Sequence, residues 1–222
     1  MNMPVPPDSG SDAITRHLRA EKKALRKQMK ALRAQISPEE YQLFSEAITA
    51  RVLALPEVQA AGVIHVFSAM ESQREPATQP LIKKLMQGNK RIVVPVMQWE
   101  ERQLHHVGLR PETPLLPNKW GIPEPPVPAA HKKSVSGAGG SARLMAPETL
   151  DVVLVPLLAG DRKGNRLGYG KGFYDRFLHQ LRPDAACFGL LYDAGLFDEI
   201  PAEPHDCPLD GFITEKQVLR VG

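Results

Sequence analysis

The chain has 222 residues, enough for one large domain or for a main domain with a small lobe. Hydrophobic residues make up 42% and charged residues 24%, as in a globular protein with a buried core, and the net charge of +3 is too small to indicate nucleic-acid binding by itself. Two cysteines without a C-x-x-C pair argue against a disulfide framework and a zinc site, and no apolar run approaches the length of a membrane span.

The N-terminal region predicts a tail followed by a basic helix. Residues 1–13 are rich in Pro, Ser and Asp and lack the apolar segment of a secretory signal, so we expect a disordered tail and a cytoplasmic protein. Over residues 14–36 apolar side chains recur at helical spacing, while the other faces are crowded with lysine and arginine. A transit peptide is the less favoured interpretation of this basic stretch.

The next part of the chain predicts a second helix and a βαβ unit. Ser37, Pro38 and Glu40 form the pattern of a capping box, which starts a helix that runs to about residue 55. Strand, loop, helix and strand then follow in the order that is typical of a parallel sheet. The predicted elements are a strand at 62–69, a loop at 71–80, a helix at 78–87, a strand at 90–96 and a possible strand at 103–107.

The C-terminal half predicts more of the same sheet. Proline-rich residues 110–128 must be extended, and residues 129–147, rich in Gly, Ser and Ala, predict a flexible insertion. Further elements are expected as a strong strand at 150–159, a helix at 172–181, a buried strand at 185–193 and a short strand at 210–214. The prediction is an α/β fold with a mostly parallel sheet.

A glycine-rich loop, "GNRLGYGKGFYDRF" at residues 164–177, joins the strong strand to the helix. It fits neither the dinucleotide fingerprint nor the Walker loop. Free N–H groups at a helix start, together with Arg166 and Lys171, predict an anion site, and a flexible turn with solvated charges is an equal alternative. Asp175 is either a partner of the helix dipole or, beside bound phosphates, a ligand of Mg²⁺.

The loop resembles the signature of the 5-formyltetrahydrofolate cyclo-ligase (methenyltetrahydrofolate synthetase) family. Four further stretches resemble the same family in the right order: "KKALRKQMKALR" at 22–33, "REPAT" at 74–78, "NKWGIPEP" at 118–125 and "HDCPLDGFITE" at 205–215. The resemblance implies a three-layer, NagB/RpiA/CoA-transferase-like α/β fold and a single domain over residues 14–222. It also implies a monomeric ligase that uses ATP and Mg²⁺ to convert 5-formyltetrahydrofolate to 5,10-methenyltetrahydrofolate, releasing ADP and phosphate after the formyl oxygen has been phosphorylated.

The resemblance also assigns residues to the site. It implies catalytic roles for Arg166 and Lys171, and Mg²⁺ ligands in Asp175 and Asp206. The residues expected at ATP are Lys22, Lys23, Ala24, Leu25, Arg26, Arg166, Leu167, Gly168, Tyr169, Gly170, Lys171, Gly172, Phe173 and Tyr174. The residues expected at the folate are Phe67, Glu75, Trp120, Tyr169 and Tyr174.

Each of these assignments has a simpler alternative. The cations of the first helix could form a solvated face, Glu75 an exposed loop acid, Phe67 and Trp120 core residues, and Asp206 a turn residue. At the level of function, the alternatives are an ATP-binding paralogue that acts on another substrate and a non-catalytic RNA-binding protein.

Three features depart from the family pattern. The loop between Ser68 and Glu75 is longer than expected, which affects the placement of Glu75. Gly160 stands where members often have Phe, so we expect looser packing under the site. Gly195 falls near a position where many members carry Gln, so one polar contact is expected to be missing.

Overall fold

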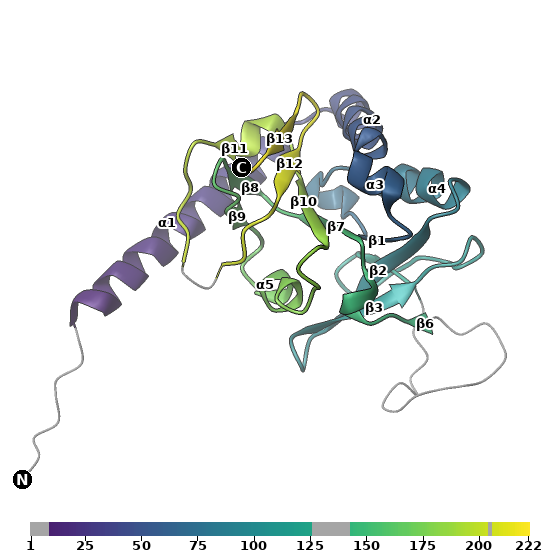
Figure 1. The fold of residues 1–222 in the computed structure, drawn as a ribbon. Helices are drawn as coiled ribbons and strands as arrows, with labels where there is room; N and C mark the ends of the chain where they lie inside the picture. Colours follow the sequence, from purple (N-terminus) through teal and green to yellow (C-terminus); the bar gives the residue numbers. More distant parts are fainter. Residues whose placement is uncertain (1–8, 126–142, 204–205) are drawn as a thin grey trace, which may run out of the picture.

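The first helix of this computed structural model extends away from the body of the molecule at its N-terminal end (Figure 1). The structure describes residues 9–125, 143–203 and 206–222. Helix α1 (Ser9–Ala34) begins at Ser9 rather than at the predicted residue 14, and residues 1–8 of the predicted tail lie outside the described residues. The C-terminal half of α1 packs on the body through Met29, which is buried.

Helices α2 (Pro38–Ala54) and α4 (Gln79–Gln87) confirm the predictions for this part of the chain. The capping box is present: the Glu40 N–H donates to Ser37 Oγ at 3.1 Å, and the Ser37 N–H donates to Glu40 Oε2 at 2.9 Å. Helix α3 (Pro56–Ala60) was not predicted, and it begins because Pro56 ends α2 and then starts a new helical turn. The short 3₁₀ segments are η1 (Glu71–Gln73), η2 (Pro147–Thr149) and η3 (Asp193–Gly195).

A mixed, mostly parallel sheet forms the centre of the fold, as predicted. In the described part of the chain it has eight strands in the order β13-β12-β10-β7-β1-β2-β3-β6. The strands from β12 to β2 pair in parallel, whereas β13, β3 and β6 join at the two edges through antiparallel pairs. Their bounds are β1 (Val63–Val66), β2 (Arg91–Gln98), β3 (Gln103–Gly108), β6 (Arg143–Leu144), β7 (Val152–Pro156), β10 (Ala186–Leu190), β12 (Gly211–Ile213) and β13 (Val218–Arg220).

The predicted strand at 150–159 is divided in two. Strand β7 ends at Pro156, and the chain then enters a second, small sheet made of β11 (Leu196–Phe197), β8 (Ala159–Asp161) and β9 (Arg166–Leu167). Gly164 makes the β8–β9 turn with a φ of +87°. Helix α5 (Phe173–Leu178) follows and is shorter than predicted. The β8–β9 hairpin therefore follows the central strand and includes the first residues of the glycine loop, a feature that was not predicted.

Residues 110–125 are only partly extended: they contain turns at 111–112 and 119–121 and the small ribbon of β4 (Leu116–Pro117) and β5 (Pro123–Glu124). The predicted insertion at 129–147 lies outside the described residues up to residue 142. Its last part forms β6, which pairs with β3.

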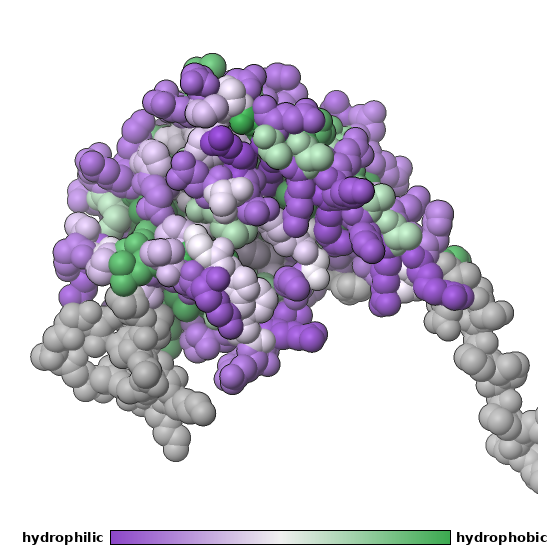
Figure 2. Space-filling view, turned by 180° about the vertical axis from the view of Figure 1, so that it is seen from behind, coloured by the Kyte–Doolittle hydropathy of each residue, from purple (hydrophilic) through white to green (hydrophobic). Residues whose placement is uncertain are grey.

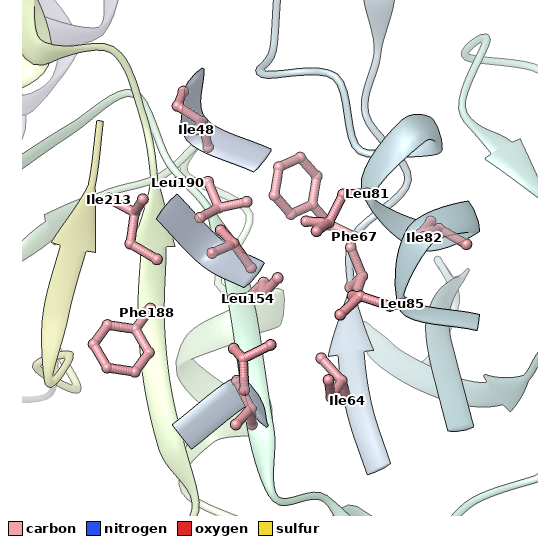
Figure 3. Packing of buried hydrophobic residues seen from close by; sticks show 14 of the residues in the cluster. Ile48, Ile64, Phe67, Leu81, Ile82, Leu85, Leu154, Phe188, Leu190 and Ile213 are labelled. Carbon is pink, nitrogen blue, oxygen red and sulfur yellow. The ribbon is translucent and has the colours of Figure 1, made fainter. Parts of the chain in front are cut away.

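Three layers result from the alternation of side chains along the strands. Ile64 on β1 and Leu154 on β7 point toward α2 and α4, where Ile48, Leu81 and Leu85 meet them (Figure 3). On the opposite face Val63, Val93 and Val153 pack against Phe173 and Phe177 of α5. A third cluster joins Met29 of α1 to Leu158, Ala159 and Leu167 of the small sheet.

The face of the molecule in Figure 2 is mostly polar. Hydrophilic side chains cover most of the face in Figure 2, and apolar side chains form small separate groups there, so the described residues of this face expose no extended apolar patch. Among the described helices, none is long and apolar enough to cross a membrane.

Both glycines that depart from the family pattern are tightly packed. A Cβ at Gly160 would lie 2.5 Å from Cε1 of Phe212, and Phe212 is fully buried, so its ring occupies the space above Gly160. The expectation of looser packing is therefore wrong. A Cβ at Gly195 would lie 2.7 Å from the carbonyl oxygen of Leu158, so a glutamine would not fit there unless the backbone moved.

Candidate functional site

A cavity of about 280 Å³ opens where the glycine loop passes over the carboxyl ends of β1, β2 and β7. This is the edge at which open α/β sheets bind ligands. Most of the residues predicted for the site line it: Lys22, Arg26, Phe67, Glu75, Trp120, Arg166, Leu167, Gly168, Tyr169, Gly170, Lys171, Gly172, Phe173, Tyr174, Asp175 and Asp206. Three do not, because Lys23 and Ala24 are exposed and Leu25 packs into the third core cluster.

Helix α1 brings two cations to one end of the cavity. The Lys22 Nζ lies 2.7 Å from both Glu203 Oε2 and Asp206 Oδ2, and this lysine is only 5% exposed. One turn later, the Arg26 Nε donates to the carbonyl oxygen of Gly168 at 2.8 Å. Burial lowers the pKa of Arg26, although the nearby carboxylates oppose that shift. The basic helix is thus tied to both the glycine loop and the C-terminal segment.

Strand β9 places a third cation beneath the loop. The Arg166 guanidinium is buried, donates to the Asp175 carboxylate and donates to the carbonyl oxygen of Cys207. Asp175 is therefore an ion-pair partner, and α5, with six residues, gives it little helix dipole. Lys171, in contrast, is exposed and makes no ion pair within the described residues.

The glycines of the loop allow its backbone conformation and leave open space beside it. Gly170 and Gly172 have φ values of +83° and +69°, which an L-residue with a side chain adopts only with strain. A Cβ at Gly168 would meet nothing within 4 Å, so the open space beside this backbone can admit a ligand.

Glu75 is buried and faces the cavity from the opposite side. Its Oε2 accepts the Met70 N–H at 2.7 Å, and its Oε1 accepts the Tyr169 hydroxyl at 2.6 Å. The longer loop is taken up by η1 and by a left-handed Arg74, which together turn Glu75 back into the site. Burial raises the pKa of Glu75, and its hydrogen bonds and the Arg33 charge oppose the rise. The interpretation of Glu75 as an exposed loop acid is wrong.

The other end of the cavity is aromatic and apolar. Trp120 is 41% exposed and stacks on Trp99, with ring centroids 4.0 Å apart, and Trp99 meets the ring of Phe173 edge-on. Phe67 is buried, and it belongs both to the core and to the cavity wall. The Tyr174 hydroxyl is buried and has no hydrogen-bond partner among the described residues.

Two carboxylates could take part in holding a metal ion. Asp175 and Asp206 both line the cavity, each beside a cation, and the described residues contain no group of three or more His, Cys, Asp or Glu side chains arranged to hold a metal. Mg²⁺ is commonly held by one or two carboxylates together with substrate phosphates and water. The pair therefore fits a magnesium ion that arrives with a phosphate ligand.

Comparison with known proteins identifies the family of the chain. The sequence model of the 5-formyltetrahydrofolate cyclo-ligase family matches residues 18–215. The chain belongs to this family. The 5-formyltetrahydrofolate cyclo-ligase of Escherichia coli K12 is 30% identical over 185 residues, which cover 82% of this chain and 94% of that protein. The mouse enzyme of the same name is 28% identical over 89% of this chain and 95% of its own length.

A solved structure agrees in fold. The solution structure of Aquifex aeolicus 5,10-methenyltetrahydrofolate synthetase has a TM-score of 0.72, with 29% identity over 90% of this chain and 92% of that one. The activity of the present chain is thus that of a 5-formyltetrahydrofolate cyclo-ligase, a folate-dependent ligase of one-carbon metabolism, and membership of the family implies use of ATP. The paralogue and RNA-binding alternatives are set aside.

Several residues that line the cavity of this cyclo-ligase were not predicted from the sequence. Met97 lies on β2 and Trp99 follows it, Ser68 follows β1, and Glu124 lies on β5, where its Oε1 accepts the Met97 N–H at 3.1 Å. Ser68 near the end of one predicted strand and Trp99 after the next were usable signals, since the carboxyl ends of parallel strands meet at one edge. No such signal marked Glu124, because in the described part of the chain β5 pairs with β4 and does not belong to the central sheet.

Proposed function

We propose that the cavity binds the triphosphate of ATP between α1 and the glycine loop, and the reduced folate between Glu75 and the tryptophan pair. The supporting observation is that one cavity is lined both by Lys22, Arg26 and Lys171 and by Glu75 and Trp120. The γ-phosphate and the formyl oxygen can then meet in a single cavity.

The chemistry follows from the bonds that must change. The formyl oxygen attacks the γ-phosphorus, and ADP leaves. N10 then attacks the formyl carbon and loses its proton, the five-membered ring closes, and phosphate leaves from the same carbon. Phosphorylation is needed because an unmodified oxygen is a poor leaving group. Phosphoryl transfer depends chiefly on positioning and on neutralising the charge.

The cations have separate tasks in this proposal. Lys171 has no ion pair among the described residues, so its ammonium is available to the transferring phosphoryl group. Arg166 is held from below by Asp175 and by the Cys207 carbonyl oxygen, which fixes its guanidinium at the cavity wall. Lys22 and Arg26 contact the triphosphate from the helix side, and the backbone N–H groups of the loop approach it from the other.

Asp175 and Asp206 would hold Mg²⁺ together with phosphate oxygens. When bound, the ion neutralises the charge on the β- and γ-phosphates. Both carboxylates already face cations, Arg166 and Lys22, so the site binds the metal as a complex with ATP in preference to the free ion.

Glu75 is placed to accept hydrogen bonds from the ring N–H groups of the reduced pterin. One donor already occupies each of its oxygens, and a carboxylate has about four lone-pair sites, so acceptor capacity remains toward the cavity. Trp120, Phe67, Tyr169 and Tyr174 supply the surrounding apolar and stacking surface.

Purified protein with 5-formyltetrahydrofolate, ATP and Mg²⁺ tests the proposal, with methenyltetrahydrofolate absorbance as the signal. We expect product only when all three are present, with release of one ADP and one phosphate per product molecule. Equal product formation without ATP would overturn it. Retained turnover when Mg²⁺ is chelated would overturn the metal assignment alone.

We also propose a cytoplasmic monomer. Cys187 and Cys207 are free thiols, as expected in a reducing compartment, and the surface in Figure 2 has only small apolar groups. Light scattering of the purified protein and imaging of the tagged chain in cells test the two parts separately. The Arabidopsis thaliana relative is named as mitochondrial, which makes the imaging informative.

A further inference from the structure

Arg33 lies behind the cavity and has no part in the function proposed above. This residue of α1 is 5% exposed and does not line the cavity. Its Nη1 donates to the Tyr169 hydroxyl at 3.2 Å, its Nη2 donates to the carbonyl oxygen of Leu157, and its guanidinium lies 5.8 Å from the centroid of the Tyr192 ring. An arginine is always charged, so α1 places a permanent cation in the interior.

Arg33 makes no direct ion pair among the described residues. It is linked by hydrogen bonds to one buried carboxylate, that of Glu75. The two are joined through one oxygen: the Tyr169 hydroxyl accepts from Arg33 and donates to Glu75 Oε1 at 2.6 Å. An O–H···O distance of about 2.5–2.7 Å is typical of a bond to an ionised acceptor. Donation by a cation to the tyrosine oxygen makes its O–H a stronger donor, so the two bonds reinforce each other.

We propose that Arg33 is a positioning residue that, through the Tyr169 hydroxyl, keeps the Glu75 carboxylate ionised and oriented for the folate. The inference rests on the proposed function, because it takes Glu75 as the acceptor for the pterin. It adds that folate affinity is set from outside the cavity, by a helix residue that touches neither substrate.

The surroundings of Glu75 explain why a distant cation matters. Tyr41 of α2, Tyr169 of the loop and Tyr174 of α5 surround this carboxylate; burial raises the pKa of each of these phenols, and the charge of Glu75 raises it further. Burial raises the pKa of Glu75, the hydrogen bonds from Met70 and Tyr169 oppose that rise, and the charge of Arg33 opposes it further. Without Arg33 the buried carboxylate takes up a proton more readily, and a protonated carboxyl group presents a donor where the pterin N–H requires an acceptor.

The first test compares Arg33→Met with Lys30→Met. Lys30 is an exposed cation one turn earlier on α1 and lies over the same Tyr169 ring at 5.3 Å, but it does not contact Glu75. We expect Arg33→Met to raise the KM for 5-formyltetrahydrofolate about tenfold at neutral pH, as for loss of a charge-assisted hydrogen bond, and to leave the KM for ATP nearly unchanged. Lys30→Met should leave both unchanged. Equal folate KM values in Arg33→Met and the parent would overturn the inference.

A double-mutant cycle tests whether Arg33 acts through the hydroxyl. Tyr169→Phe removes only the bridging oxygen, so adding Arg33→Met to it should raise the folate KM no further. Additive effects would overturn the bridged arrangement. Arg33→Lys, which keeps the charge and is the milder change, should recover part of the folate affinity, and circular dichroism of each variant checks that the fold is retained.

A direct readout separates this inference from the role of Glu75 itself. In ligand-free protein with ¹³C-labelled glutamate, Glu75→Gln identifies the Glu75 carboxyl signal. Arg33→Met should move its titration midpoint to higher pH, and Lys30→Met should not. An unmoved midpoint overturns the inference. A moved midpoint with an unchanged folate KM in Glu75→Gln overturns the proposed folate role of Glu75, while the Arg33–Glu75 link stands.

Discussion

The Arg166 guanidinium and the Asp175 carboxylate form an ion pair at the cavity, and the two residues are 9 positions apart along the chain. This pair holds the two ends of the glycine loop together, because Arg166 lies on β9 and Asp175 lies in α5. The same carboxylate is the one proposed to hold Mg²⁺. Its removal should therefore affect both the shape of the loop and the binding of MgATP.

Asp175→Asn should reduce kcat by about a hundredfold or more, as for loss of a preorganised charge contact at the transferring group. Asp184→Asn is the matched control, since Asp184 also pairs with an arginine, Arg182, but is 76% exposed in its side chain. The control should be fully active. Calorimetric titration with MgATP should show weakened binding in Asp175→Asn alone. Near-normal turnover with a small loss of melting temperature would instead identify Asp175 as a structural residue.

Lys171→Met should lower kcat by about a hundredfold and change the folate KM little, because a cation at the transferring phosphoryl group acts mainly in the transition state. Lys163→Met is the control: Lys163 lies in the β8–β9 turn and pairs with Glu199 on the surface. Steady-state kinetics with each substrate varied in turn make the distinction. A change confined to the folate KM would show that the loop grips folate and not phosphate.

Gly168→Ala and Gly195→Ala should behave in opposite ways. A Cβ at Gly168 meets nothing within 4 Å, so the melting temperature should be unchanged, whereas the KM for ATP should rise because the methyl group occupies the ligand's space. A Cβ at Gly195 would lie 2.7 Å from a backbone oxygen, which should cost about 1–3 kcal/mol of stability. Thermal unfolding and ATP kinetics on both variants check this. A destabilised Gly168→Ala would contradict it.

Stability should fall as the pH drops from neutral toward 4. Burial lowers the pKa of His106 from its ordinary 6.5 to about 4, and lowers the pKa of His65 well below 6.5. Between those pH values the unfolded chain binds more protons than the folded one, so the free energy of unfolding rises with pH. Full protonation of His106 in the unfolded chain alone corresponds to about 3 kcal/mol.

Urea unfolding across this pH range measures that slope. Glu75 acts in the opposite sense, because its raised pKa favours the folded state at low pH and that contribution is lost as the pH rises through it. The comparison of parent and His106→Leu removes the Glu75 contribution, and the variant should show the smaller slope. His179→Gln, at an exposed position, should keep the slope of the parent. An unchanged slope in His106→Leu would contradict the assignment.

Local sequence signals carried much of the fold. The Ser37–Glu40 capping box and the buried run at β7 depend on neighbouring residues only, so they were predicted and confirmed. The break after Pro156 was missed because Leu157, Leu158 and Ala159 continue an apolar run, although they turn into a different sheet. Strand β13 was missed because its pairing depends on β12, and three residues carry little periodicity.

Most residues of the site could be predicted, but their arrangement in space could not. The resemblance supplied the residue identities, yet Lys23 and Ala24 fall on the solvent side of α1, and only helix packing decides which face turns inward. The Tyr169–Glu75 hydrogen bond spans 94 residues, and no local pattern encodes such a pairing. The Phe212 ring fills the space that a side chain at position 160 would occupy. A comparison of single positions cannot detect such a compensation between two strands.

The Lys22–Asp206 ion pair affects when the cavity can form during translation. Its partners are 184 positions apart in the sequence, so α1 cannot complete this contact until the segment that carries Asp206 has been made. A nascent chain can fold its earlier parts as they emerge. The cavity, however, lacks one wall until Asp206 has left the ribosome, and the proposed ATP site can form only after that point.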